Sequence, residues 1–222
     1  MNSFRAGNRG LRAAGLTAAA AVAMGLSSAG AAQADAFVSL PDGERLGPGV
    51  KLTRSGEHAV VSPSLAANGA GRVAWLSATV TAEVTATPAG TPGPNNGPRN
   101  APGSNNSSTH GVSRISAGYI VGCQVSIGED AISAGVSGNV SLNSAGVGGS
   151  LGIKLGPGQV GFVGIEGKDI SKPGAYSIQY RDAELQVQGC AGYAQARSYA
   201  VVEIVGNDYS KTTLYGQPFS IG

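Results

Sequence analysis

The sequence lacks an apolar run long enough to form a membrane-spanning helix. Such a helix needs about 20 consecutive apolar residues, and the apolar run at residues 13–26 falls short of this. Charged residues make up only 13% of the chain and aromatic residues only 5%. If this chain enters a membrane, it does so as strands, which cross a bilayer only in a closed barrel with every backbone group paired.

Residues for catalysis or metal binding are scarce as well. The two histidines, His58 and His110, have no Cys, His or carboxylate neighbour at the spacing that metal sites use. No Gly-x-Ser-x-Gly motif occurs, and residues 161–168 depart from a phosphate-binding loop because Phe162 stands in place of its first glycine. We therefore expect no enzyme activity, no catalytic residue, no metal and no cofactor.

Residues 1–34 have the composition of a secretory signal peptide. Arg5, Arg9 and Arg12 precede the apolar run, and residues 32–34, Ala-Gln-Ala, offer a small-x-small cleavage site. We therefore expect export through the inner membrane. Three of the fifteen Lys and Arg residues lie in this segment and none of the thirteen Asp and Glu, so the rest of the chain carries a formal net charge of −1. No basic surface remains to bind a nucleic acid.

The remaining residues, about 188 in number, predict one all-β domain. Glycine is frequent, at 36 residues, but has no Gly-X-Y period, and no long segment repeats with the period of a helix. Trp75 is expected to anchor the core, and the Pro-, Gly- and Asn-rich residues 88–110 are expected to form a loop. Strands are expected at 37–40, 50–53, 73–87, 111–127 and in several segments from residue 176 to the end.

Residues 131–155 form the most regular pattern of the chain. Even-numbered positions are apolar or glycine over 131–143, and odd-numbered positions are so over 147–155. A hairpin folded at 144/145 pairs even positions with odd ones, so both apolar rows lie on the same face. Its strands are long enough to cross a hydrocarbon layer at a tilt of about 45°, and the alternation is that of a transmembrane barrel. A half-buried hairpin in a soluble sandwich has the same alternation.

Turn signals bound this hairpin and suggest how the chain is divided. Glu129 and Asp130 stand at its entrance, and residues 156–158, Gly-Pro-Gly, stand at its exit. The predicted organisation is a β-sandwich-like rim domain from residues 35–128 and 157–222, with a protruding stem hairpin from residues 129–156.

Two cysteines flank the predicted stem. An even number of cysteines in an exported chain favours a disulfide between Cys123 and Cys190. Two buried thiols are the alternative.

Three motifs carry a family resemblance. Residues 118–122 (Gly-Tyr-Ile-Val-Gly), 197–200 (Arg-Ser-Tyr-Ala) and 212–219 (Thr-Thr-Leu-Tyr-Gly-Gln-Pro-Phe) together resemble the MspA-like porins of mycobacteria. The resemblance implies a goblet-shaped oligomer, an octamer in the family's best-known form, in which each subunit adds one stem hairpin to a β-barrel across a mycolic-acid outer membrane. The implied partners are further copies of the chain or a paralogous subunit, outer-membrane lipids and small hydrophilic solutes.

On this interpretation the two faces of the stem have different surroundings. The residues expected to line the pore are Ser133, Ser137, Asn139, Ser141, Asn143, Ser144, Ser150, Lys154 and, near the rim, Glu129. The residues expected to face lipid are Ile132, Val136, Val140, Leu142, Val147, Leu151, Ile153 and Leu155.

The stem tip departs from the family. Residues 143–146, Asn-Ser-Ala-Gly, carry no carboxylate, whereas the family has an acidic constriction there, so the resemblance implies no ion selectivity. Two alternatives stay open. One is a secreted soluble β-sandwich that binds the cell wall or a partner, and the other is a porin subunit that needs a second, different subunit.

Overall fold

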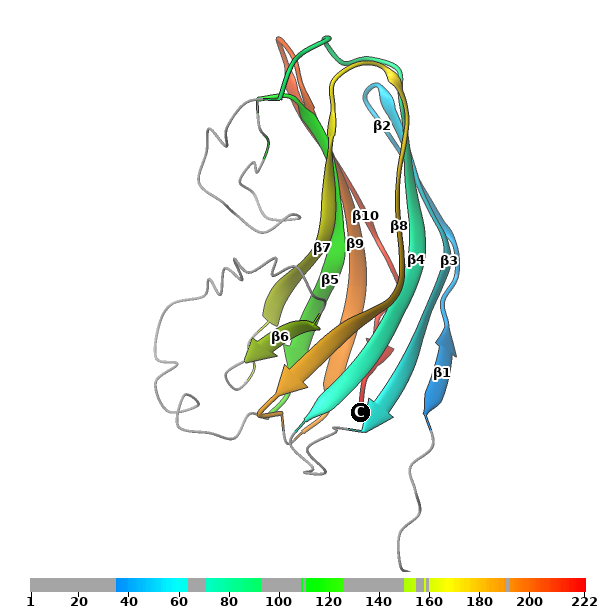
Figure 1. Ribbon diagram of the computed structural model, residues 1–222, viewed down its shortest axis with the longest axis vertical. Helices are drawn as coiled ribbons and strands as arrows, with labels where there is room; N and C mark the ends of the chain where they lie inside the picture. Colours follow the sequence, from blue (N-terminus) through cyan, green and yellow to red (C-terminus); the bar gives the residue numbers. More distant parts are fainter. Residues whose placement is uncertain are drawn as a thin grey trace, which may run out of the picture. The chain divides into compact units, whose positions relative to one another are not determined.

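The computed structural model describes residues 35–63, 71–92, 109, 111–125, 150–154, 158, 160–190 and 192–222. These residues form two sheets packed face to face (Figure 1). Sheet A contains β1 (Ala36–Ser39), β2 (Gly43–Gly47), β3 (Val50–Pro63), β4 (Arg72–Val84), β8 (Gly174–Gln188) and β6 (Ser150–Lys154). Sheet B contains β10 (Tyr209–Tyr215), β9 (Ala194–Val205), β5 (Ser113–Cys123), β7 (Val160–Ile170) and β11 (Phe219–Ser220).

The all-β fold class is therefore confirmed. Both sheets are antiparallel, except that β6 runs parallel to β8 at the edge of sheet A. In the part of the chain that the structure describes, no helix is long and apolar enough to cross a membrane.

The core lies between the inner faces of the two sheets. On β4 the residues of one parity, such as Leu76 and Val80, are buried, whereas Thr79 on the other parity faces away from the core. Ile115 and Val121 of β5 meet them from sheet B. Alternate side chains of a strand stand on opposite faces, and each large aliphatic side chain buried in this way contributes about 1.5–3 kcal/mol.

The prediction for Trp75 is wrong. Its ring is only half-buried and lies on the outer face of sheet A, because Trp75 has the parity opposite to the core row of Ala74 and Leu76. Its cross-strand neighbours are Val60 and Glu184. The core of β4 is instead built from smaller aliphatic residues.

A buried polar cluster joins the two sheets. Arg54 Nε and Glu57 Oε2 of β3 lie 2.6 Å apart, with both side chains almost wholly buried. The hydroxyl of Tyr119 on β5 donates to Glu57 Oε1 at 3.0 Å, and the hydroxyl of Tyr180 on β8 donates to Tyr119 at 3.2 Å. Burial raises the pKa of both tyrosine hydroxyls above the usual value. The cluster therefore holds two neutral hydroxyls beside one internal ion pair.

Two glycines of the resembling motifs are required by close packing. A Cβ on Gly118 would lie 2.2 Å from the carbonyl oxygen of Val163 and 2.4 Å from the hydroxyl of Tyr199. A Cβ on Gly216 would lie 2.2 Å from Ser198 Oγ. Neither gap leaves room for a side chain, so these motif glycines serve the packing of the rim domain.

Candidate functional site: the root of the predicted stem

The described residues that precede and follow the predicted stem come together at one place. We call this place the stem root and define it as residues 123–125, 158 and 160. On one side of the outgoing chain, Gln124 N–H donates to the Tyr193 carbonyl at 2.9 Å, which continues the ladder between β5 and β9. On the other side, Gly158 N–H donates to the Cys123 carbonyl at 3.2 Å. The outgoing and returning chains are therefore hydrogen-bonded neighbours at the root.

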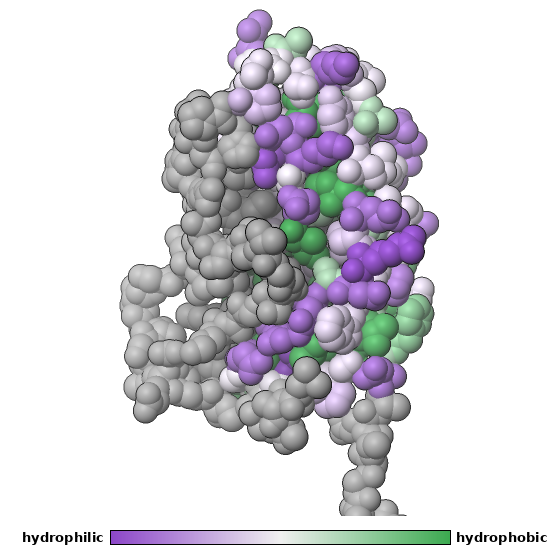
Figure 2. Space-filling model, in the orientation of Figure 1, coloured by the Kyte–Doolittle hydropathy of each residue, from purple (hydrophilic) through white to green (hydrophobic). Residues whose placement is uncertain are grey.

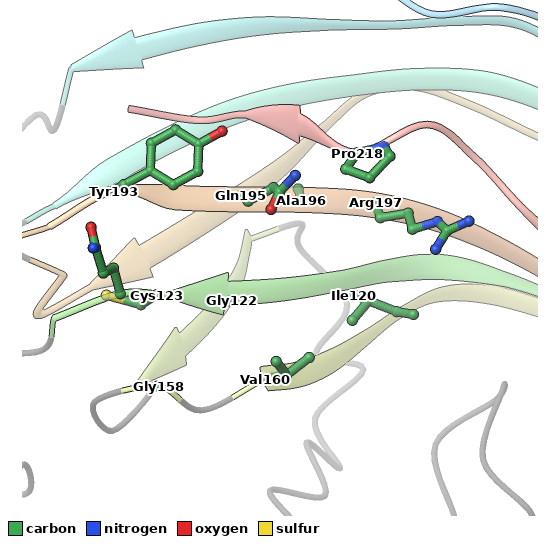
Figure 3. A pocket seen from close by; sticks show the side chains of 11 residues that line it. Ile120, Gly122, Cys123, Gly158, Val160, Tyr193, Gln195, Ala196, Arg197 and Pro218 are labelled. Carbon is green, nitrogen blue, oxygen red and sulfur yellow. The ribbon is translucent and has the colours of Figure 1, made fainter.

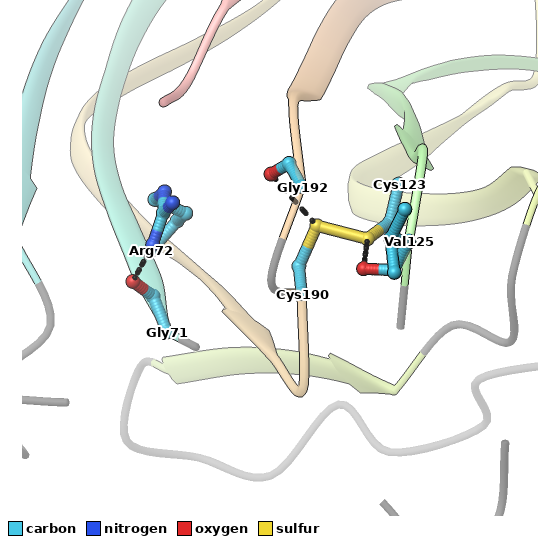
Figure 4. The surroundings of a disulfide bond; sticks show 6 residues. All are labelled: Gly71, Arg72, Cys123, Val125, Cys190 and Gly192. Carbon is cyan, nitrogen blue, oxygen red and sulfur yellow. Dashed lines mark hydrogen bonds between the residues drawn. A yellow bond between two sulfur atoms is a disulfide. The ribbon is translucent and has the colours of Figure 1, made fainter. Parts of the chain in front are cut away.

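A disulfide closes the root against sheet A. Cys123 at the end of β5 is bonded to Cys190, which follows β8, with a Cα–Cα distance of 5.9 Å. The two sulfur atoms lie 3.0 and 3.5 Å from the carbonyl oxygens of Val125 and Gly192 (Figure 4). The predicted pairing of the two cysteines is confirmed, and it ties both sheets together beside the outgoing chain.

The strand register changes by one residue at the root. Over residues 118–122 of β5, beyond the register shift at Ala117/Gly118, even-numbered residues face even-numbered residues of β7, as Gly122 faces Val160. The next bond outward joins Gly158 to Cys123, an even residue to an odd one. Gly158 has a φ of 68°, a left-handed conformation that favours glycine and occurs at glycine β-bulges. Even-to-odd pairing is the parity that the predicted stem needs to place both of its apolar rows on one face.

The second half of the predicted stem is a strand where the structure describes it. β6 covers Ser150–Lys154 and pairs in parallel with Glu184–Gln188 of β8. In the predicted hairpin these residues would pair with 135–139, which lie outside the described residues. A single chain offers no neighbouring hairpin as a partner, whereas β8 offers an open sheet edge.

Most of the predicted pore and membrane residues lie outside the described part of the chain. For the pore row these are Glu129, Ser133, Ser137, Asn139, Ser141, Asn143 and Ser144, and for the lipid row they are Ile132, Val136, Val140, Leu142, Val147 and Leu155. Ser150, Leu151, Ile153 and Lys154 lie on β6. The roles assigned to all of these residues stay predictions, as do the signal peptide and the hairpin itself.

The structure adds a groove that sequence reasoning missed. It lies on the outer face of sheet B beside the stem root and has a volume of about 620 Å³ (Figure 3). Ile120, Val160, Tyr193 and Pro218 supply its apolar lining, and Arg197 supplies its charge. The alternation of β5 and β9 could have indicated this surface, because Ile120 and Arg197 stand on the strand face opposite to the core rows of these two strands.

Arg197 is held in a fixed position at this groove. Its Nε donates to the carbonyl of Gly216 at 2.7 Å, and its guanidinium group lies 4.9 Å from the centre of the Tyr215 ring. A cation over an aromatic face and a charge-assisted hydrogen bond both restrict the side chain. The positive charge is therefore presented at a defined point of the sheet B surface.

The described residues contain no group of His, Cys, Asp or Glu side chains arranged to hold a metal ion.

Comparison with known protein families matches residues 100–220 to the family described as MspA. No curated protein matches the chain. The matched segment covers more than half of the chain and includes all three resembling motifs and the stem root. The chain therefore belongs to the MspA family, whose members are oligomeric β-barrel porins and not enzymes.

Proposed function

We propose that the mature chain, beginning at Asp35, is a porin subunit that forms a water-filled channel for small hydrophilic solutes. Copies of the chain assemble so that the rim domains form a ring and the stem hairpins, residues 129–156, close one barrel across a mycolic-acid outer membrane. A single hairpin has two open edges, so only its neighbours in such a ring can pair all of its backbone groups.

The stem root is the observation that carries this proposal. Its outgoing and returning chains are hydrogen-bonded side by side through Gly158 and Cys123, as the two strands of a hairpin that starts there would be. A disulfide fixes the insertion point to both sheets. A domain that is anchored in this way can carry a long hairpin without a change in its own core.

The alternation of residues 131–155 assigns the two faces of that hairpin. The hydroxyl and amide residues line the water-filled lumen and the aliphatic residues face lipid, as in transmembrane barrels. Lys154 carries the only charge in this stretch. Repetition around a ring turns it into a belt of positive charge.

Planar bilayer recording with purified, detergent-extracted protein tests the proposal. Stepwise conductance from this chain alone supports a homo-oligomeric channel. Conductance that needs extracts containing a second polypeptide supports a channel of two different subunits. A water-soluble monomer that never conducts contradicts the proposal.

Lys154→Glu tests the assignment of the lumen. Every copy in the ring changes charge together, so the reversal potential in a salt gradient should shift toward cation selectivity. The matched control is Lys51→Glu on the rim strand β3, which should leave the reversal potential unchanged. An unchanged reversal potential for Lys154→Glu would exclude this residue from the lumen.

One observation favours a soluble binding module as the second candidate. In the single chain β6 is already paired with β8, so part of the predicted stem is held by the sandwich itself. The bilayer experiment distinguishes the two candidates, because a module docked on itself gives no conductance.

A further inference from the structure

An apolar patch lies on the outer face of sheet A, near the end at which the disulfide sits. Phe37, Val60 and Trp75 are successive cross-strand neighbours on β1, β3 and β4. Phe37 is 67% exposed, and Trp75 and Val60 are half-buried. Figure 2 shows hydrophobic surface at the lower right of the view, where Figure 1 places β1. We call these three residues the sheet A patch.

The groove beside the stem root lies on the opposite outer face of the sandwich, at the same end. Val160 is 60% exposed and Tyr193 is 51% exposed. The Cys123–Cys190 disulfide marks this end, because it joins the last residue of β5 to the segment that follows β8. The two apolar surfaces are thus separated by the thickness of the sandwich and do not contact each other.

Neither surface is needed to fill the core. Large aliphatic and aromatic residues such as Leu52, Ile115 and Tyr119 already fill the space between the sheets. Exposed clusters of large apolar side chains on a folded domain are characteristic of contact surfaces. Phe37 lies beside the ring of His58, with ring centroids 5.3 Å apart, but most of its side chain stays exposed, so this contact does not cover the patch.

We infer that the sheet A patch of one subunit docks in the sheet B groove of the next. This inference rests on the proposed channel, and it assigns the contact that joins its rim domains. A ring built from identical copies requires a head-to-tail contact between two different surfaces of each copy. A pair of unlike apolar surfaces on opposite faces of one domain meets that requirement.

Charge complementarity supports a second copy of the chain as the partner of the sheet B groove. The row of the sheet A patch continues from Trp75 to Glu184 on β8, so a negative charge follows the apolar residues. The positively charged Arg197 is one of the residues that line the sheet B groove. Docking the patch in the groove places Glu184 and Arg197 on facing surfaces, where opposite charges fix the register of a contact.

The spacing of the stem also requires contact at this end of the rim. Neighbouring strands of a barrel lie about 4.8 Å apart, so adjacent two-stranded hairpins are separated by only about 10 Å or slightly more. Two packed sheets are themselves about 10 Å apart before the outer side chains are counted. Rim domains joined to adjacent hairpins are therefore in contact with one another at the end of the sandwich from which the predicted stem leaves, and both surfaces lie toward that end.

Cysteine cross-linking of assembled channels tests the inference. Phe37→Cys and Val160→Cys are both exposed positions, and the two native cysteines are already bonded to each other. A chain carrying both substitutions, treated with a short bifunctional thiol reagent, should give a ladder of multimers on a denaturing gel. Each single variant should give monomers, and a mixture of the two single variants should give dimers and nothing longer.

Leu46→Cys combined with Val160→Cys is the matched control. Leu46 is 70% exposed, but it pairs with Lys51 at the far end of β3 from Val60, so this combination should give no ladder. Glu184→Arg should lower the yield of assembled channel several-fold, and Arg197→Glu in the same chain should restore part of it.

The outcomes separate the contact from the channel. Channels that conduct but give no ladder of multimers overturn the proposed contact and leave the proposed channel intact. In that case, protection of Val160→Cys from the thiol reagent in the monomer would show that its own chain or a lipid fills the groove. Dimers from a single variant would indicate a like-to-like contact and also overturn it. Wild-type protein that neither assembles nor conducts overturns the proposed channel and this contact together.

Discussion

β5 of the rim and residues 131–143 of the predicted stem both alternate between apolar and small or polar residues. The inner row of β5 includes Ile115, Tyr119 and Val121, and all three side chains are fully buried. The apolar row of residues 131–143 contains Ile, Ala, Val, Gly and Leu but no aromatic residue. The same period of two therefore carries two different sets of side chains.

The difference lies in what completes the burial of each row. Tyr119 fills the core and also donates its hydroxyl to Glu57, so β5 is satisfied within one chain. The stem row has no polar group to place and suits a surrounding that is apolar throughout, which a lipid bilayer provides. The inner row of β5, which packs within one chain, therefore includes a large aromatic side chain with a hydrogen bond, whereas the apolar row of the predicted stem has only small and aliphatic residues.

The largest effect is expected where the rim depends on its internal ion pair. Glu57→Ala leaves the buried Arg54 charge without its partner, so the free energy of unfolding should fall by about 3–5 kcal/mol. Chemical unfolding at neutral pH measures this loss. Glu44→Ala is the control, because its pair with Lys51 is largely exposed and should contribute about 1 kcal/mol or less. Equal losses from both substitutions would contradict the assigned role of the cluster.

A slightly smaller effect is expected at the stem root. Replacing both Cys123 and Cys190 with Ser removes a bridge across 67 residues, which is worth up to about 4 kcal/mol in the chain-entropy account. The rim should lose stability while channels that do assemble keep their conductance, because the proposed lumen is lined by the stem and not by the bridge. Altered single-channel conductance would instead place the root in the permeation path.

Alkaline pH should weaken the rim through its buried tyrosines. Burial raises the pKa of Tyr119, Tyr180 and Tyr199 above the value of about 10 in the unfolded chain. Above pH 10 the unfolded chain releases protons that the native chain keeps, so each tyrosine lowers the free energy of unfolding by about 1.4 kcal/mol per pH unit. Tyr180→Phe should make the fall in the free energy of unfolding shallower by about 1.4 kcal/mol per pH unit, the contribution of one tyrosine. An identical slope in the variant would contradict the assignment.

The sequence predicted the fold class, the disulfide and the family because each depends on local or compositional features. Alternation indicated several of the strands, although it missed β2, β7 and most of β3, and the cysteine count in an exported chain indicated one bridge. The motifs at 118–122 and 212–219 were informative for a physical reason, since Gly118 and Gly216 lie where the structure has no room for a Cβ.

The features that the sequence did not predict depend on tertiary placement. Trp75 was expected to anchor the core, yet the parity of β4 places it on the outer face. The sheet B groove draws residues from β5, β7, β9 and the segment before β11, so no single stretch of sequence contains it. The parallel pairing of β6 with β8 likewise joins residues that no local pattern connects.

Accessibility of neighbouring stem positions to a charged thiol reagent tests the central claim most directly. Ser141→Cys and Val140→Cys each introduce one free thiol, because the two native cysteines are bonded to each other. In conducting channels the water-soluble reagent should reduce the current of Ser141→Cys and leave that of Val140→Cys unchanged. Equal modification of both positions, or of neither while the channels conduct, would contradict a stem whose alternate residues face water and lipid.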